Sequence, residues 1–249
     1  MLCLHGFGMH GRQFSILEKY IGNDYTLYGI DLFFHNNTVL HNNNLENIKS
    51  GISQKEFAEF ISDFCLSQKI DKFSLLSYSL GTIYATVLMH RLAHRIEESI
   101  LIAPICLKIN PLMLFFAKNK IGNKLLEKLS LSDNGLYNLL LLAKKIKILD
   151  DTSTEILWKE VATPELRFNM YANFTYLKNF DVDIEEVSKI VNQFRMPTYF
   201  IFGKKDHSIS PKYADRVKHK FRNAKVKILN ADHDLVNDKL TTDILFCHS

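Results

Sequence analysis

Three residue types that can act together as a nucleophile are spread along this chain of 249 residues. Ser79, Asp206 and His233 each follow an apolar run typical of a buried strand. A serine hydroxyl is a weak nucleophile until a base removes its proton. That base is usually a histidine, held in the correct tautomer by a carboxylate. The three residues, in this order, therefore predict a catalytic triad for acyl transfer.

The sequence around Ser79 is typical of a sharp turn between a strand and a helix. An apolar run ends on small residues, and the segment 83–94 then predicts a helix. In a nucleophile elbow the serine adopts strained backbone angles that expose its hydroxyl. The residues two positions before and after it must then be small. Gly81 meets this requirement, and Ser77 is a small residue where such turns usually have glycine.

A glycine-rich turn, His5-Gly6-Phe7-Gly8, follows a very short apolar strand at 1–4. Such a turn can present backbone N–H groups to a ligand. An oxyanion hole needs donors of this kind, already aimed where negative charge develops. An ordinary turn between a strand and a helix would have the same composition. We expect His5 to brace this loop.

Other residues could replace members of the triad. Asp232 and Asp234 flank His233, and His207 adjoins Asp206. Neighbours in an extended loop rarely point their side chains at each other, so Asp206 is the preferred partner of His233. Tyr78, next to the nucleophile, is expected either to line the substrate pocket or to pack inside.

A metal site is not expected. His90 and His94 are four residues apart, a spacing that zinc can use on a helix. The glutamate of the H-E-x-x-H motif is absent from this stretch, so surface histidines are the simpler interpretation. The predicted reaction needs neither a metal nor an organic cofactor.

Alternating strands and helices indicate a parallel, doubly wound sheet. Strands are expected at 1–4, 25–31, 73–78, 99–104, 198–203 and 225–229. Helices are expected at 14–21, after a capping box at Ser53-Gln54-Lys55-Glu56, at 83–94, at 211–221 and at the end of the chain, and 32–45 is expected to be a loop. Ligands of such sheets bind beyond the carboxyl ends of the strands.

The alternation of strands and helices stops between residues 105 and 195, a segment that is leucine-rich and predicted to be helical. Helices are expected at 111–131, 136–148, 154–161, 165–176 and 183–194, the last returning to the sheet. We therefore expect a core in two parts, 1–104 and 197–249, with a helical cap at 105–196. Phe115 and Phe116 in the cap are candidates for the substrate pocket.

The composition is that of a globular protein, with 47% hydrophobic and 23% charged residues. No segment is apolar enough to span a membrane, and the start does not have the pattern of a signal peptide. The four cysteines, Cys3, Cys65, Cys106 and Cys247, have no paired spacing and indicate reduced thiols in the cytoplasm. A net charge of +4 gives no reason to expect nucleic acid as a partner.

Taken together, these motifs resemble the α/β-hydrolase superfamily. The matching segments are His5-Gly6-Phe7-Gly8, Asp31-Leu32-Phe33-Phe34-His35, Ser77-Tyr78-Ser79-Leu80-Gly81, Gly203-Lys204-Lys205-Asp206 and Asp232-His233. The order serine, aspartate, histidine also matches the family. The resemblance implies oxyanion donors from the backbone N–H groups of Phe7 and Leu80. The helical cap is similar to those of small carboxylesterases, thioesterases and biotin-pathway methyl esterases.

The chain departs from the family pattern at three points. Ser77 replaces the first glycine of the elbow, and Thr82 stands where a second glycine often follows. The family usually has two strands before the His-Gly loop, so either the sheet is smaller or the start is shortened.

The predicted function is hydrolysis of an acyl ester or thioester through an acyl-enzyme. A lyase or carbon–carbon hydrolase using the same triad is an alternative, and so is a binding protein with a vestigial triad. Dehalogenases and epoxide hydrolases do not fit, because they have aspartate at the nucleophile position.

Lysines are concentrated in the expected cap. Between Lys108 and Lys147 there are eight lysines, two acidic residues and no arginine, which gives about +6. A solvated helix face is one interpretation. The other is a landing site for an acidic acyl carrier protein, coenzyme A or, less favoured, an anionic membrane surface.

Overall fold

The computed structural model describes residues 1–36, 38–146, 151–159, 161–237 and 240. The chain forms two compact units. The sheet unit contains Met1–Leu32, Ser53–Lys108 and Phe180–Ser249, and the helical unit contains Phe33–Ile52 and Ile109–Asn179.

The sheet unit is built on parallel strands. Among the described residues there are six, in the order β2-β1-β3-β4-β5-β6, and every neighbouring pair is parallel. Their bounds are β1 Leu2–Leu4, β2 Tyr28–Ile30, β3 Phe73–Tyr78, β4 Ile96–Ile102, β5 Thr198–Gly203 and β6 Ala224–Leu229. All residues of β3 and β5 are buried, as expected for central strands covered on both faces.

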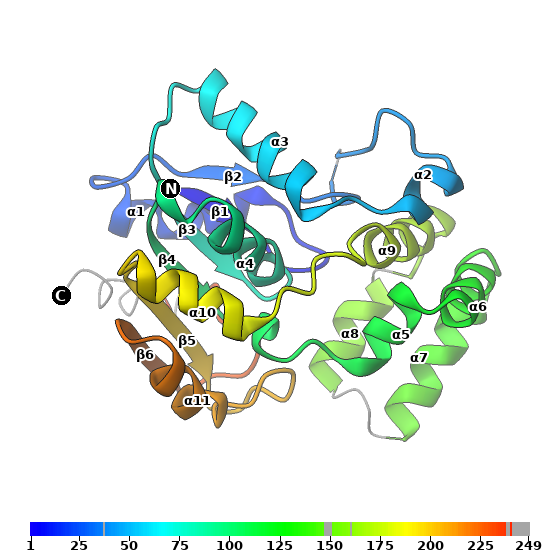
Figure 1. The fold of residues 1–249 in the computed structure, drawn as a ribbon. Helices are drawn as coiled ribbons and strands as arrows, with labels where there is room; N and C mark the ends of the chain where they lie inside the picture. Colours follow the sequence, from blue (N-terminus) through cyan, green and yellow to red (C-terminus); the bar gives the residue numbers. More distant parts are fainter. Residues whose placement is uncertain (37, 147–150, 160, 238–239, 241–249) are drawn as a thin grey trace. The chain divides into compact units, whose positions relative to one another are not determined.

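Helices cover both faces of this sheet. On one face α3 (Gln54–Ser67), α4 (Gly81–Arg91), α10 (Ile184–Gln193) and α11 (Tyr213–Lys220) form a row in which each helix contacts the next (Figure 1). The short helices η1 (Gly11–Leu17) and α1 (Glu18–Ile21) lie on the other face, and η1 contacts β1 and β2. This confirms the predicted doubly wound α/β fold.

Aromatic side chains hold the first row of helices together. The ring centroid of Phe180, just before α10, is 5.1 Å from that of Phe57 on α3 and 5.2 Å from that of Tyr84 on α4. All three side chains are almost fully buried, so each adds a large apolar area to the core. The short helix η2 (Ala93–Arg95) ends the connection from α4 to β4.

The helical unit packs around one buried helix, α9 (Pro164–Tyr176), which contacts α2, α5 and α6. The other helices of this unit are α2 Leu45–Ser50, α5 Pro111–Lys118, α6 Lys120–Ser130, α7 Gly135–Lys145 and α8 Asp151–Lys159. The helix expected at 111–131 is divided at Asn119, whose side chain accepts hydrogen bonds from the first N–H groups of α6.

The two units differ from the sequence-based domain boundaries in three places. Residues 105–108, expected at the start of the cap, belong to the sheet unit. Segment 33–52, expected to be mostly a loop of the core, belongs to the helical unit, because Asn173 Nδ2 on α9 donates to the Phe33 carbonyl and Ile52 N donates to the Tyr176 carbonyl. Helix α10 belongs to the sheet unit, where it packs on α4.

The remaining elements agree with the sequence in kind and differ in length. The helix expected at 14–21 is η1 followed by α1, and the strand expected at 25–31 is reduced to β2. The capping box forms, since Glu56 N donates to Ser53 Oγ and Ser53 N donates to Glu56. The expected terminal helix lies mostly outside the described residues. None of the helices described is long and apolar enough to cross a membrane.

Candidate active site

The topology of the sheet brings the expected site residues to one edge. Strands β1 and β3 are neighbours, yet β1 leads to η1 on one face and β3 leads to α4 on the other. The loops that follow the two strands therefore diverge, and the crevice between them is the usual ligand site of such sheets. The His-Gly loop follows β1, and Ser79 follows β3.

The turn at Ser79 has the geometry of a nucleophile elbow. Ser79 has a φ of 47°, in the left-handed region that a non-glycine residue rarely adopts. Its N–H donates to the Ile102 carbonyl of β4 at 2.9 Å, and its carbonyl accepts from Thr82 N at 2.9 Å. These bonds hold the strained turn in place.

The two departures from the glycine pattern are both satisfied by hydrogen bonds. Thr82 Oγ1 donates to the Ser79 carbonyl at 2.6 Å and accepts from Cys106 N at 3.3 Å. Ser77 is fully buried, and its hydroxyl donates to the Ile100 carbonyl at 3.2 Å. Small hydroxyl side chains therefore replace glycine here without leaving a buried polar group unpaired.

Serine, histidine and aspartate form one hydrogen-bonded chain. Ser79 Oγ is 2.8 Å from His233 Nε2, and His233 Nδ1 is 2.8 Å from Asp206 Oδ2. Because the carboxylate can only accept, Nδ1 carries a proton and Nε2 is free to accept the serine proton. This is the arrangement that turns a serine into a nucleophile.

Asp206 is fixed by its own loop. Its Oδ1 accepts from Ser208 N at 2.8 Å and Ile209 N at 3.0 Å, and its side chain is inaccessible to solvent. The other candidate residues, Asp232, Asp234 and His207, are exposed. Asp206 is thus the carboxylate that the structure brings to His233.

The loop expected to carry one oxyanion donor, Phe7, is braced by His5. Leu32 N donates to His5 Nε2 at 2.9 Å, so Nδ1 holds the proton and donates to the Gly6 carbonyl at 2.7 Å. Gly6 N donates to the Gln13 side chain at 3.2 Å. Phe7 follows directly on this fixed peptide.

The second expected donor, Leu80, is the N-cap residue of α4. The first N–H groups of a helix have no acceptor within the helix, which makes them natural anion donors. The roles of Phe7 and Leu80 in an oxyanion hole stay predictions.

The three pocket candidates belong to different units of the chain. Tyr78 is buried in the sheet unit, and its hydroxyl donates to the His233 carbonyl at 3.0 Å. Phe115 and Phe116 are on α5 of the helical unit, with ring centroids 5.6 Å apart. The Phe115 ring lies against Gly122 of α6. The sequence does not indicate the contact between Tyr78 and His233, because the two residues are 155 positions apart in the chain.

His90 and His94, whose spacing raised the question of a zinc site, lie on different helices. His90 is on α4, 3.7 Å from Glu186, whereas His94 is in η2 and exposed. Burial lowers the pKa of His90, and the neighbouring Arg91 lowers it further. In the part of the chain that the structure describes, no three His, Cys, Asp or Glu side chains are grouped to hold a metal ion.

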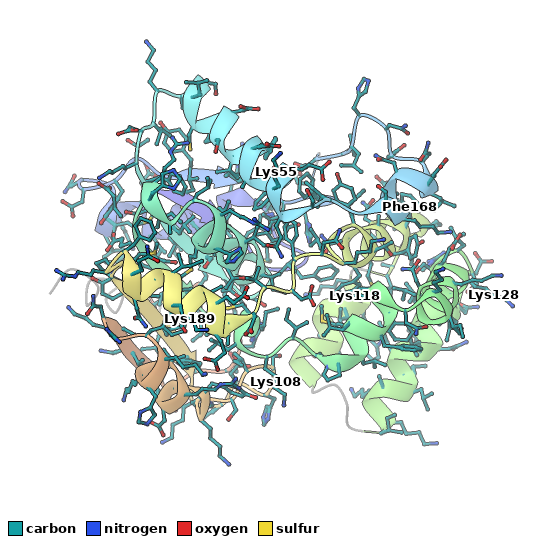
Figure 2. The ribbon with its side chains drawn as sticks, in the orientation of Figure 1. Lys55, Lys108, Lys118, Lys128, Phe168 and Lys189 are labelled. Atoms are coloured by element: carbon teal, nitrogen blue, oxygen red, sulfur yellow. The ribbon has the colours of Figure 1, made fainter. Side chains whose placement is uncertain are left out.

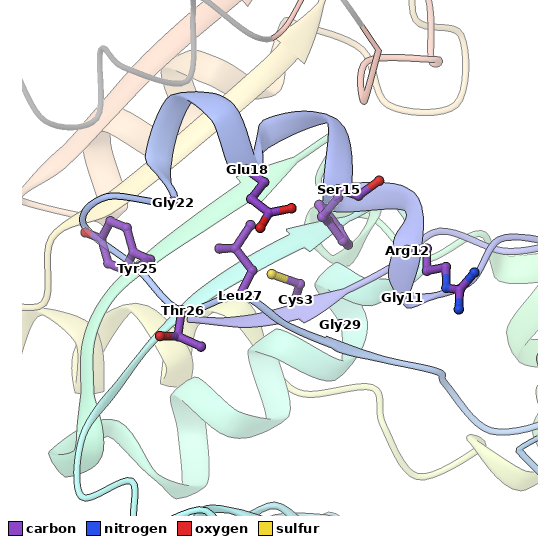
Figure 3. A pocket seen from close by; sticks show the side chains of 11 residues that line it. Cys3, Gly11, Arg12, Ser15, Glu18, Gly22, Tyr25, Thr26, Leu27 and Gly29 are labelled. Atoms are coloured by element: carbon purple, nitrogen blue, oxygen red, sulfur yellow. The ribbon is translucent and has the colours of Figure 1, made fainter.

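A cavity of about 430 Å³ lies between η1, α1 and the strand β2 (Figure 3). Arg12, Glu18 and Tyr25 contribute to its wall, together with small residues such as Gly29. None of the triad residues lines it. This cavity is therefore separate from the candidate active site.

A parallel sheet with a serine elbow after a central strand and a helical insertion is the α/β-hydrolase fold, and the protein is a serine hydrolase of that fold. The family model described as "Serine aminopeptidase, S33" matches residues 1–239, so the chain belongs to this family.

Solved structures share the fold at low sequence identity. MGS-M2, an α/β hydrolase from a Medee basin deep-sea metagenome library, is 15% identical, with a TM-score of 0.69 over 99% of this chain and 86% of its own. A hydrolase from Oleispira antarctica is 16% identical, with a TM-score of 0.64 over 100% and 90%. The enol-lactonase from Burkholderia xenovorans LB400 is 14% identical, with a TM-score of 0.62 over 99% and 90%. No curated protein matches the sequence.

Proposed function

We propose that this hydrolase cleaves an acyl ester or thioester through a covalent acyl-enzyme. The observation that carries the proposal is the hydrogen-bonded chain from Ser79 through His233 to Asp206, with both links at 2.8 Å. The left-handed turn at Ser79 adds to it, because that turn is the strained feature of a nucleophile elbow.

In the proposed mechanism Ser79 Oγ attacks the substrate carbonyl while His233 Nε2 takes the serine proton. Asp206 keeps the imidazole oriented and stabilises the imidazolium that forms. The N–H groups of Phe7 and Leu80 hold the oxyanion of the tetrahedral intermediate. His233 then gives its proton to the leaving alcohol or thiol, and a water molecule, activated by the same histidine, hydrolyses the acyl-enzyme.

Three other chemistries could use the same residues. The family description names an aminopeptidase, so an amide is a candidate substrate. A lyase or a carbon–carbon hydrolase could also use this triad, and a binding protein could keep it unused. The enol-lactonase among the structural neighbours acts, by its name, on a lactone, and a lactone is a cyclic ester.

A fluorophosphonate probe and a substrate panel test the proposal. Ser79 should be the labelled residue, and Ser79→Ala should abolish labelling. The panel compares p-nitrophenyl esters, an acyl thioester, aminoacyl anilides and carbon–carbon substrates. Turnover of the esters or thioester above the others is expected. Labelling without ester or thioester turnover would favour the alternative chemistries, and no labelling would favour a binding role.

The proposal also includes the partner that supplies the acyl group. The lysine-rich segment from Lys108 to Lys147 carries exposed Lys118 and Lys128 (Figure 2). Glu127, one of its two acids, is engaged by Lys49 at 2.7 Å within the helical unit. We infer an acidic acyl donor, either a carrier protein or coenzyme A. A cytoplasmic location agrees with Cys3, Cys65 and Cys106, which are free and buried.

A further inference from the structure

The side chain of Tyr78 lies between two loops of the candidate active site. Tyr78 is the last residue of β3 and directly precedes Ser79. Its side chain is 5% exposed, so it contributes little surface to a substrate pocket. It contacts instead the loop that carries His233, called here the histidine loop, and the His-Gly loop that carries Gly6.

The hydroxyl of Tyr78 holds the main chain of His233. It donates to the His233 carbonyl at 3.0 Å, and the two ring centroids are 5.7 Å apart. Among the described residues, no other hydrogen bond to the His233 main chain is found. The phenol therefore fixes the backbone from which the imidazole reaches Ser79.

The ring of Tyr78 lies against the other loop. A Cβ added to Gly6 would be 2.6 and 2.7 Å from two ring carbons of Tyr78. The ring thus packs directly on the Gly6 backbone, and the carbonyl of Gly6 also accepts from His5 Nδ1 and Met9 N. One aromatic side chain consequently sets the spacing between the expected oxyanion loop and the histidine loop.

Tyr78 stays a hydrogen-bond donor over the working range of an esterase. Burial raises the pKa of its phenol, and the carboxylates of Asp234, Asp206 and Asp232 raise it further. The neutral phenol is therefore retained at neutral and moderately alkaline pH.

We propose that Tyr78 is a positioning residue, which places the His233 imidazole correctly between Ser79 Oγ and the leaving group. The inference rests on the proposed ester hydrolysis. General base and general acid catalysis both need the imidazole within hydrogen-bond reach, and a misplacement of about 1 Å can cost on the order of a hundredfold in rate. Tyr78 acts through His233 and does not need to touch the substrate.

Tyr78→Phe removes the hydroxyl and keeps the ring. The test compares a p-nitrophenyl ester with a methyl ester of the same acyl group. Nitrophenolate leaves without a proton, whereas methoxide must receive one from His233. We expect kcat to fall about threefold on the nitrophenyl ester and about thirtyfold on the methyl ester. The loss is larger on the methyl ester because only that leaving group depends on His233 as a general acid. KM should change less than about twofold, since no binding group is lost.

Two controls separate positioning from general stability. Tyr25→Phe removes another hydroxyl of the sheet unit, one that donates to Glu98, and should leave kcat unchanged on both esters. In a His233→Ala background, Tyr78→Phe should cause no further loss, because residues that act as a unit are not additive.

Gly6→Ala provides a second variant if Tyr78→Phe fails to fold. Its added methyl group should displace the Tyr78 ring and reproduce the larger loss on the methyl ester. If Tyr78→Phe has the same kcat as the wild type, or if its kcat falls equally on both esters, the positioning role is overturned. The proposal that the protein hydrolyses esters would not be affected by either result. A wild-type protein that cleaves neither ester and is not labelled at Ser79 would overturn the proposed function and, with it, this inference.

Discussion

Gly81 lies directly against the carbonyl group of Leu4. A Cβ added to Gly81 would be 2.0 Å from the Leu4 oxygen and 2.9 Å from the His5 oxygen. Both atoms are backbone, and Leu4 is paired with Ser77 in the register of β1 and β3. The start of α4 therefore packs directly against the end of β1. This contact brings the elbow at Ser79 close to the His-Gly loop.

Gly81→Ala should damage this arrangement. The methyl group cannot be accommodated by a side-chain rotation, so either α4 or β1 must move. We expect a destabilisation of about 1–3 kcal/mol, the usual range for overpacking, and a loss of ester hydrolysis larger than the loss of stability alone would cause. Thermal unfolding and kcat/KM measure the two effects. A stable and fully active variant would show that the close contact is not needed.

The triad gives the second prediction. Ser79→Ala, His233→Ala and Asp206→Asn should each lower kcat by orders of magnitude with the fold retained, as measured by ester hydrolysis and circular dichroism. The losses should not add, because the three residues act as one unit. Asp232→Asn is the matched control, since this carboxylate is exposed beside His233 and should change kcat less than about threefold. A larger effect at Asp232 than at Asp206 would reverse the assignment of the acid.

The sequence alone predicted the sheet and the proximity of three candidate triad residues, because both depend on local signals. An apolar run predicts a strand wherever it lies, and the carboxyl ends of parallel strands meet at one edge. Ser79, Asp206 and His233 could therefore be paired without knowledge of any contact. Their hydrogen bonds agree with that pairing.

Features that depend on long-range contacts could not be predicted in this way. The segment 33–52 has the composition of a surface loop, yet it is part of the helical unit through bonds to residues in and just after α9, more than 120 residues away. The same holds for Tyr78, whose partner is 155 residues away. Asn119 divides a long apolar periodicity into α5 and α6, because its side chain caps the second helix.

The capping box of α3 gives a prediction about pH. The Ser53 hydroxyl and the Ser53 backbone N–H both lower the pKa of Glu56. A carboxyl group whose pKa is lower in the folded state stabilises the fold above its ordinary pKa of about 4.3, and this contribution is lost as the pH falls through the folded pKa. Glu56→Gln should therefore be less stable than wild type near pH 7, and the difference should vanish near pH 3.

Urea unfolding at a series of pH values measures this difference. Glu56 is exposed, so the effect is small. Ser53→Ala by itself should destabilise the protein by about 1 kcal/mol. When Glu56→Gln is added to this variant, the further loss of stability at pH 7 should be smaller than the loss that Glu56→Gln causes in the wild type. The reason is that the Ser53 hydroxyl, the main cause of the low pKa of Glu56, is then absent. A loss that is independent of pH would contradict the role given to the charge.

The lysine-rich segment gives the last prediction. Lys118, Lys120 and Lys124 are exposed on α5 and α6 of the helical unit, beside the exposed apolar side chains of Phe115 and Ile121. If an acidic carrier protein delivers the acyl group, these lysines speed its encounter with the enzyme. Salt screens such steering over about 8 Å at physiological ionic strength. For an acyl carrier protein thioester, kcat/KM should fall on the order of tenfold between about 50 and about 500 mM NaCl, by the usual size of steering effects.

A small neutral ester has no charge to steer, so its hydrolysis should change little with salt. Replacing Lys118, Lys120 and Lys124 by glutamine should flatten the salt response of the carrier substrate and leave the small ester unaffected. The matched control replaces three exposed lysines of the sheet unit, Lys72, Lys189 and Lys218, with the same change in net charge. If both triple variants respond alike, net charge rather than a docking site explains the effect. If neither changes the response, these lysines form a solvated helix face and no more.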